Sequence, residues 1–172
     1  SLCYYCACNK VITKDRSKSA IYLNYLAKEL QLVKQHLTAR ETISQLHLGG
    51  GTPTFLSEAE MRGLMAMLRE HFDFAADAEI SLEIDPRTVT AETLQLLADV
   101  GFNRTSLGVQ DFDEQVQIAV HRIQPYDMVE KCITQSRAVG FQSINFDLIY
   151  GLPKQSLESF SRTLDQVIAL SP

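Results

Sequence analysis

The residues best suited to chemistry stand at the start of the sequence, where three of its four cysteines lie within six positions. These are Cys3, Cys6 and Cys8. Thiolates spaced this closely favour a thiophilic metal or an iron–sulfur cluster, because both need soft anionic ligands that converge on one point. A set of free or redox-active thiols is the alternative. Structural zinc is less favoured, since its sites usually have four ligands, and no second cysteine pair or His-x3-His follows.

Polar residues also recur where segments that read as strands come to an end. The turn Gly49-Gly50-Gly51-Thr52 follows the first such segment. Glu83 with Asp85, Gln110 and Asp147 lie at or near the ends of the next three. In parallel βα folds this C-terminal edge is where active sites form. An acidic side chain within an apolar strand is costly to bury alone. We therefore expect Glu83 and Asp147 to have partners or to face a ligand.

The elements that must position these residues follow from the periodicity of the apolar residues and from capping signals, which are Ser57 with Glu60, Thr90 and Ser156. Helices are expected at residues 17–37, 58–72, 91–100, 114–120, 126–139 and from 157 onward, and strands at 43–48, 79–84, 105–109 and 143–149. The last helix is expected to carry Phe160, Leu164, Val167 and Ile168 on its apolar side. Strands that alternate with helices imply a parallel sheet, so the fold class is α/β.

Composition narrows the function classes. The chain has 172 residues, of which 45% are hydrophobic, and a formal net charge of −5. This length fits one domain with a real core, and the acidic balance argues against a nucleic-acid partner. No apolar run approaches the roughly 20 residues that cross a bilayer. Clustered cysteines without a secretory signal indicate a reducing compartment, so we expect a cytoplasmic protein with no membrane partner.

Five ordered blocks of the sequence resemble the oxygen-independent coproporphyrinogen III oxidases of the radical S-adenosylmethionine superfamily. The blocks are CYYCACNK, QLHLGGGTPT, AEISLEIDPR, GFNRTSLGVQDF and NFDLIYGLPKQ. Cys3 and Cys6 resemble the last two cysteines of the superfamily motif Cys-x3-Cys-x2-Cys, whose first cysteine would fall two residues before Ser1. The resemblance implies a partial (β/α)6 TIM-like barrel with outer helices.

The same resemblance implies that residues 1–172 are a radical S-adenosylmethionine core domain that is incomplete at both ends. The first strand, the last strand and a C-terminal domain of the family would be missing. We therefore expect such a piece to be inactive alone.

The resemblance also implies cofactors and their ligands. Cys3 and Cys6 would hold a 4Fe–4S cluster whose open iron binds S-adenosylmethionine. Gly50 would meet the amino group of this molecule, Glu83 would accept a hydrogen bond from it, and Tyr5 would pack beside its adenine. The alternatives are a plain strand-to-helix turn for Gly50, an ion pair with Arg87 or Arg104 for Glu83, and simple packing for Tyr5.

A second S-adenosylmethionine site is implied by five matching positions, which are Gly51, Thr52, Gln110, Arg122 and Asp147. In that site Arg122 could clamp a carboxylate and Asp147 could face a cationic sulfonium or ammonium. A surface arginine and an ion pair within the barrel wall are the respective alternatives. Cys8 resembles an additional cysteine of the oxidases that is not a cluster ligand, and whether it is catalytic or a plain loop thiol stays open.

The activity implied is oxidative decarboxylation of coproporphyrinogen III to protoporphyrinogen IX by a 5′-deoxyadenosyl radical. It would require a low-potential electron donor such as flavodoxin or ferredoxin, and we expect a monomer at full length. The alternative is the related haem chaperone, which binds and transfers haem. That family typically has Cys-x-Tyr-Cys-Asp-Phe where this chain has Cys6-Ala7-Cys8, and Ser in place of Asp111, so both features favour the oxidase.

The histidines suggest no metal site. His47 lies in a strand and is interpreted as a satisfied core residue. His36, His71 and His121 are expected to face solvent, and Cys132 is expected to be an inert core thiol.

Overall fold

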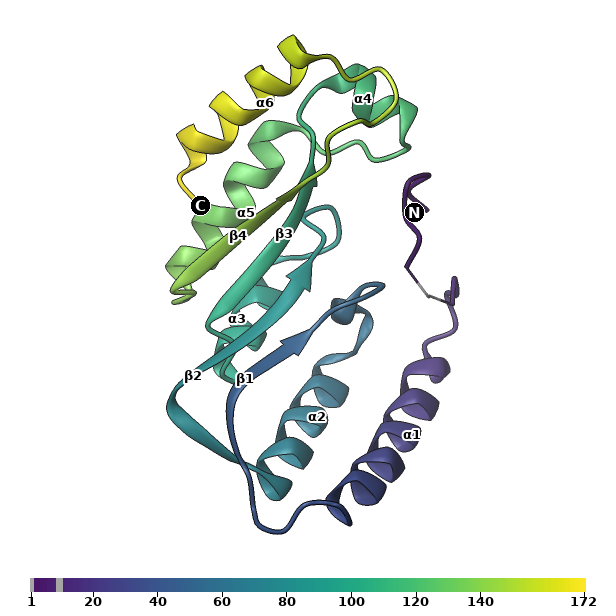
Figure 1. Ribbon diagram of the computed structural model, residues 1–172, viewed down its shortest axis with the longest axis vertical. Helices are drawn as coiled ribbons and strands as arrows, with labels where there is room; N and C mark the ends of the chain where they lie inside the picture. Colours follow the sequence, from purple (N-terminus) through teal and green to yellow (C-terminus); the bar gives the residue numbers. More distant parts are fainter. Residues whose placement is uncertain (1, 9–10) are drawn as a thin grey trace.

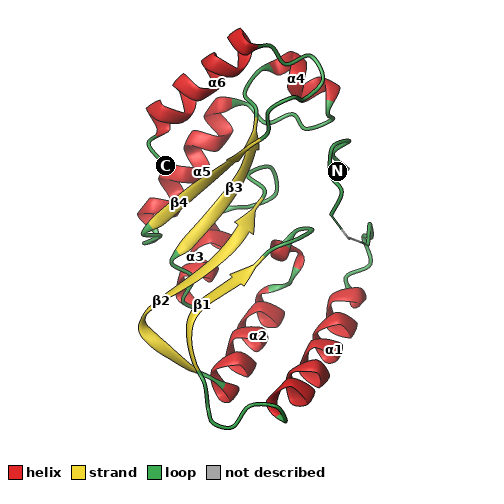
Figure 2. Ribbon diagram, in the orientation of Figure 1, coloured by secondary structure: helices red, strands yellow, loops and turns green. Residues whose placement is uncertain are grey.

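The computed structural model describes residues 2–8 and 11–172. Its four strands form one parallel sheet in the order β1-β2-β3-β4, and the helices lie behind that sheet and beside it (Figure 1; Figure 2). The strands are β1 (Thr42–Leu48), β2 (Asp73–Ile84), β3 (Arg104–Gln110) and β4 (Ser143–Leu148). The helices are α1 (Ser17–Lys34), the 3-10 turn η1 (Pro53–Phe55), α2 (Glu58–His71), α3 (Ala91–Asp99), α4 (Glu114–Ala119), α5 (Tyr126–Ala138) and α6 (Leu157–Leu170). The expected α/β class with a parallel sheet is confirmed.

The helix starts follow from local capping. The Ser57 hydroxyl accepts the amide hydrogen of Glu60, whose carboxylate in turn accepts the amide hydrogen of Ser57, so the predicted capping box is present at α2. Ser156 forms a capping box with Ser159 at α6, and the Thr90 hydroxyl caps α3 by accepting the amide hydrogen of Thr93. Each such cap satisfies amide groups that a helix otherwise leaves without partners.

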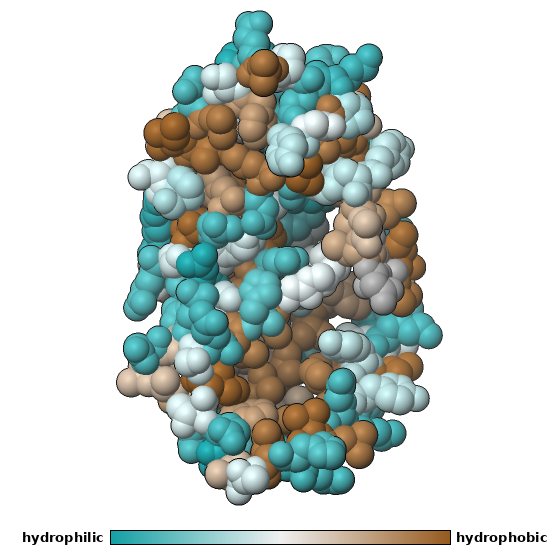
Figure 3. All heavy atoms as spheres, viewed as in Figure 1, coloured by the Kyte–Doolittle hydropathy of each residue, from teal (hydrophilic) through white to brown (hydrophobic). Residues whose placement is uncertain are grey.

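The two faces of the sheet differ sharply. Ile80, Leu82 and Ile84 of β2 point to the helices and are buried in the main core. Their neighbours Ser81 and Glu83 point to the opposite face, because successive side chains of a strand alternate. Hydrophilic side chains cover the middle of that face, while apolar ones gather over α6 (Figure 3). The helices therefore stabilise one side of the sheet, and the other side is available for a polar site.

Several boundaries differ from the predictions, among them the end of α1, which is Lys34 rather than residue 37. β2 begins at Asp73 rather than at Glu79, and α2 ends at His71, so Phe72 caps the helix instead of extending its apolar stripe. Asp73 and Phe74 pair with Thr42 and Ile43 of β1. This pairing with a neighbouring strand, which short-range periodicity does not register, lengthens β2.

The predicted apolar side of α6 is only partly buried, since Phe160 and Val167 are half-buried. Leu164 is 39% exposed and Ile168 73% exposed, whereas Ser159, Thr163 and Leu170 are buried. Thr163 faces inward because its hydroxyl donates to Asp111 Oδ1 at 2.7 Å and accepts the amide hydrogen of Phe112. These polar contacts orient the helix and leave part of its apolar stripe in solvent.

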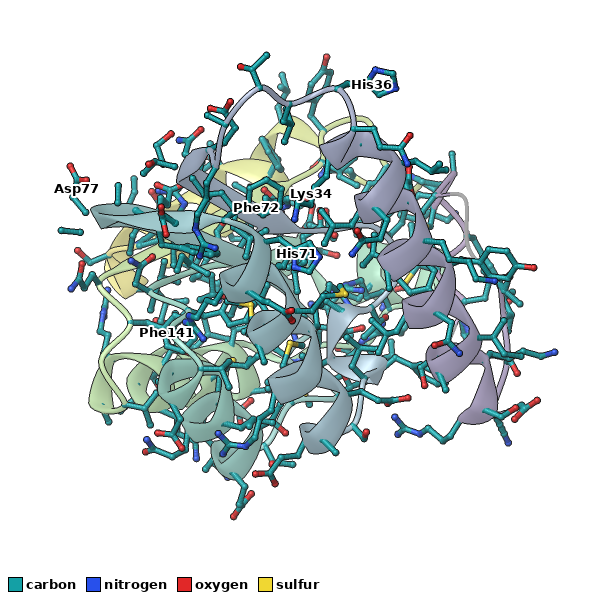
Figure 4. The ribbon with its side chains drawn as sticks, turned by 90° about the horizontal axis from the view of Figure 1, so that it is seen from below. Lys34, His36, His71, Phe72, Asp77 and Phe141 are labelled. Carbon is teal, nitrogen blue, oxygen red and sulfur yellow. The ribbon has the colours of Figure 1, made fainter. Side chains whose placement is uncertain are left out.

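His71 does not simply face solvent. It lies at the end of α2, on the side toward α1 (Figure 4), and its Nε2 accepts a hydrogen bond from the side-chain amide of Gln31 at 2.7 Å. Its Nδ1, which then carries the proton, is buried without a partner among the described residues.

None of the helices in residues 2–8 and 11–172 has both the length and the apolar content needed to cross a bilayer.

Candidate active site

The glycine turn after β1 is joined directly to the end of β2. Gly50 and Gly51 have φ angles of 74° and 63°, a region that residues other than glycine rarely adopt. This conformation directs the Gly50 amide to Glu83, whose Oε2 accepts it at 3.0 Å. A Cβ atom placed on Gly50 would meet no other atom within 4 Å. The turn thus presents open space beside a carboxylate, which suits a ligand better than a purely structural turn.

Glu83 does not form the ion pairs considered as alternatives for it. Arg87 pairs with Asp85 at 2.6 Å, and Arg104 lies 3.5 Å from Glu79. The side chain of Glu83 is 46% exposed and lies 3.9 Å from His47 Nε2. The carboxylate is therefore available to a ligand at the sheet edge.

His47 is not a buried core histidine, since its side chain is 53% exposed. Its Nδ1 lies 2.8 Å from the Ser81 hydroxyl, which itself donates to the Leu46 carbonyl oxygen. Because that hydroxyl has a single proton, Nδ1 must be the donor to Ser81. This fixes the tautomer and leaves Nε2 facing Glu83.

A polar cavity of about 350 Å³ occupies the face of the sheet away from the helices. It includes both acidic residues expected at the strand ends, Glu83 and Asp147. Asp147 accepts hydrogen bonds from Ser106 Oγ at 2.8 Å and from Asn145 Nδ2 at 3.0 Å. The remaining lining comes from Gln45, Leu46, His47, Glu79, Ser81, Arg104, Ser106 and Asn145. Three carboxylates against one arginine make this cavity suited to a cationic ligand.

The N-terminal segment lies against the loops that follow β3. The Tyr4 amide donates to the Val120 carbonyl at 3.0 Å, the Tyr4 ring stacks on His121, and His121 Nδ1 donates to the Leu2 carbonyl at 2.9 Å. His121 is therefore not only a solvent-facing residue. These contacts bring the cysteine motif to the C-terminal edge of the sheet.

Cys3 and Cys6 share one tight turn, in which the Cys6 amide donates to the Cys3 carbonyl at 3.2 Å. Tyr5 between them packs against the small apolar cluster of Val116, Val120 and Leu152, and burial raises the pKa of its phenol. The structure thus supports packing for Tyr5, and its contact with adenine stays a prediction.

Two arginines converge on the buried sulfur of Cys3. Arg87 Nη2 lies 3.6 Å and Arg122 Nη1 3.5 Å from Cys3 Sγ. Burial opposes the thiolate, but the hydrogen bond and charge of Arg122, with those of Arg87, hold the pKa of Cys3 below its ordinary value. A thiolate is the form that ligates iron, so this environment fits a cluster ligand.

Arg122 is buried, contrary to the surface alternative. Its Nη2 donates to the Gly108 carbonyl at 2.6 Å, and its Nη1 lies 3.4 Å from Asp85 Oδ2. Its Nε has no partner among the described residues. A carboxylate clamp by Arg122 would therefore compete with Asp85 and Cys3 for the same guanidinium.

The other predicted site residues lie at the same edge. Gln110 ends β3 with a φ of 68°, at a shift in the β3–β4 register. Thr52 precedes η1, and its carbonyl accepts the Phe55 amide at 2.9 Å. Cys8 is exposed and Cys132 is buried. Within the described residues no three His, Cys, Asp or Glu side chains are grouped to hold a metal.

Arg87 was not predicted as a site residue, whereas Asp85 was expected near the strand-end site together with Glu83 but without a role of its own. The only available signal was their position, since Asp85-Pro86-Arg87 directly follows β2 as the glycine turn follows β1. Asp85 is 84% buried at its side chain and contacts both Arg87 and Arg122. Proximity between loops after different strands cannot be read from the sequence of either loop.

Comparison with known proteins identifies the family. A sequence profile of the Radical SAM superfamily matches residues 1–167. The chain is 52% identical to the oxygen-independent coproporphyrinogen III oxidase of Pseudomonas aeruginosa and 49% identical to that of Helicobacter pylori J99, in each case over 100% of this chain and 38% of the relative. The solved coproporphyrinogen III oxidase of Escherichia coli, described as a radical SAM enzyme, superposes with a TM-score of 0.92 at 48% identity, covering 100% of this chain and 39% of that one.

The chain spans well under half the length of the relatives it matches. The superposition confirms the expected radical SAM fold, and the family profile covers nearly every residue. This chain belongs to the Radical SAM superfamily.

Proposed function

We propose that this chain supplies the cluster-binding and S-adenosylmethionine-binding part of an oxygen-independent coproporphyrinogen III oxidase. One observation carries the proposal. The Cys3 sulfur, against Arg87 and Arg122, and the Gly50–Glu83 contact both lie at the C-terminal edge of the sheet, and Glu83 also lines the acidic cavity. The relatives of that name, 48–52% identical over the whole of this chain or nearly so, support the choice of reaction.

In this proposal Cys3 and Cys6 bind the cluster together with a cysteine upstream of Ser1. When bound, a 4Fe–4S cluster supplies the electron that cleaves S-adenosylmethionine into methionine and a 5′-deoxyadenosyl radical. The chain orients that substrate. Gly50 provides open space for the amino group, and Glu83 offers a carboxylate to a molecule that carries sulfonium and ammonium charges.

The second S-adenosylmethionine is proposed to lie toward Asp147, beside Gly51, Thr52 and Gln110. Asp147 is exposed and shares the cavity with Glu83, which favours a cationic group there. Arg122 would join this site only after releasing contacts that it makes with Cys3 or Asp85.

Coproporphyrinogen III carries propionate carboxylates, and the described cavity is acidic, so its binding determinants are proposed to lie largely outside residues 1–172. The electron would come from a low-potential protein such as flavodoxin or ferredoxin. A cytoplasmic, monomeric full-length protein remains our expectation.

The test is anaerobic reconstitution of the full-length protein with iron and sulfide, followed by addition of reductant, S-adenosylmethionine and coproporphyrinogen III. We expect 5′-deoxyadenosine, carbon dioxide and protoporphyrinogen IX. Stoichiometric haem binding without carbon dioxide release would instead favour the haem chaperone. Bound zinc, without the visible absorption that bleaches when a cluster is reduced, would exclude both.

A further inference from the structure

We propose that Asp85 is a positioning residue that holds Arg87 and Arg122 as two hydrogen-bond donors to Cys3 Sγ, and that these donors raise the reduction potential of the cluster that Cys3 binds. The second half of this inference rests on the proposed function. Its first half concerns only the described residues.

One guanidinium nitrogen of each arginine lies close to both Asp85 Oδ2 and Cys3 Sγ. Asp85 Oδ2 lies 2.6 Å from Arg87 Nη2 and 3.4 Å from Arg122 Nη1. The same two nitrogens lie 3.6 and 3.5 Å from Cys3 Sγ. Each guanidinium therefore bridges one carboxylate and one sulfur, and the carboxylate is common to both.

Asp85 fixes Arg87 more firmly than a single contact would. Its Oδ1 accepts from the Arg87 amide at 3.1 Å and from Nε at 2.9 Å, while Oδ2 accepts from Nη2. This forked pairing sets the plane of the guanidinium. Arg122 is fixed from its other side by the Gly108 carbonyl oxygen.

The charges of Asp85, Arg87 and Arg122 are buried and must therefore be balanced locally. The side chains of Asp85, Arg87 and Arg122 are only 16%, 14% and 9% exposed. Two adjacent guanidinium groups repel each other in such an environment, and one carboxylate offsets only one of them. When Cys3 ligates iron as a thiolate, it supplies the second negative charge.

The two arginine donors are expected to raise the reduction potential of the cluster. Reduction adds one electron, taken from dithionite in a titration and from the low-potential protein donor in the proposed reaction. Donors and positive charge near a ligating sulfur stabilise the more negative, reduced state and raise the potential. Loss of one arginine donor should therefore lower the midpoint potential, by about 59 mV if the one-electron equilibrium shifts tenfold.

Substitution of Asp85 separates positioning from simple charge. Asp85→Asn removes a negative charge, which alone would raise the potential. If Asp85 instead holds the arginines on the sulfur, their release outweighs this effect and the potential falls. A lowered reduction potential in Asp85→Asn would thus indicate the positioning role, and a raised one would indicate an effect of charge alone.

The experiment is a redox titration, followed by electron paramagnetic resonance, of the reconstituted full-length protein and its variants. We expect lower midpoint potentials for Arg87→Gln and Asp85→Asn, a smaller decrease for Arg87→Lys, and the wild-type value for Arg162→Gln, whose arginine is exposed and pairs with Glu158. An unchanged potential in Arg87→Gln, or a raised one in Asp85→Asn, would overturn the proposal. Iron content is measured alongside.

A crystal structure of Asp85→Asn, purified without iron, tests positioning independently of the cluster. We expect both guanidinium groups beyond hydrogen-bond distance of Cys3 Sγ, and their retention at the sulfur would refute the role of Asp85. If the wild-type protein takes up no cluster, the proposed function and the inferred effect on the potential both fail. The structure of the variant then decides the positioning role alone.

Discussion

The amide of Gly50 donates to Glu83 Oε2 at 3.0 Å and so ties the turn after β1 to the end of β2. A carboxylate held in this way, with its side chain still 46% exposed, can serve a second donor from a ligand. In the radical SAM reaction proposed above, that donor is S-adenosylmethionine.

Glu83→Gln should weaken binding of S-adenosylmethionine about tenfold, or about 1.4 kcal/mol. The amide oxygen of glutamine can still accept from Gly50, but a neutral acceptor binds a cationic ligand less strongly than a carboxylate. Equilibrium dialysis of the reconstituted full-length protein measures this change. The control is Glu158→Gln at an exposed position, and equal affinity in the two variants would argue against the role of Glu83.

Thr163→Val should destabilise the fold by about 1–3 kcal/mol, because the buried Asp111 carboxylate and the half-buried Phe112 amide lose their shared partner. Thr163 and Asp111 are each only 1% exposed. Unfolding in guanidinium chloride measures the loss. Ser161→Ala, on the exposed side of the same helix, should leave the transition unchanged, and similar curves for both variants would contradict the structure.

Acid should destabilise the protein partly through Asp85. Burial opposes its charge, but hydrogen bonding to Arg87 and the charge of Arg122 hold its pKa below the ordinary value of 3.8. Its stabilising contribution is therefore complete above that pH and is lost as the pH falls through the lower, folded-state pKa.

Asp85→Asn should accordingly show a shallower decline of unfolding free energy below about pH 3.8. Urea unfolding at a series of pH values measures the slope. Asp165→Asn, at an exposed position of α6, should retain the wild-type slope. A steep decline in the Asp85 variant would assign the acid sensitivity to other groups.

Cys132 should react with iodoacetamide far more slowly than Cys8. Cys132 is 4% exposed, and its burial raises its pKa to about 11, which keeps the thiol protonated near neutral pH. Cys8 is exposed. Peptide mapping by mass spectrometry gives both alkylation rates. In the unfolded chain the two rates should become similar. Comparable rates in the folded chain would place Cys132 outside the core.

Much of the fold could be predicted from local signals. The capping residues Ser57, Thr90 and Ser156 marked three helix starts correctly, because a cap depends on residues within four positions. α6 shows the limit. Its apolar stripe predicted one orientation, but the contact of Thr163 with Asp111, 52 positions away, determines the observed one.

The candidate site could likewise be predicted only in part. Glu83 and the glycine turn were predictable, since both end neighbouring strands of a parallel sheet. The convergence of Arg87 and Arg122 on Cys3 was not predictable, because it joins residues up to 119 positions apart. Arg122 in particular was expected either on the surface or at a carboxylate, and in the structure it is buried against a sulfur.

The alternation along β2 has a consequence for how this sequence can change. Deleting one residue between Ile80 and Glu83 would turn carboxylates toward the helices and isoleucines toward water, since side chains alternate with a period of two. A change of one residue in the length of β2 would thus exchange its polar and apolar faces beyond the point of change. The connection at residues 35–41, which joins α1 to β1, carries no such alternation, so insertions there should leave both sides intact.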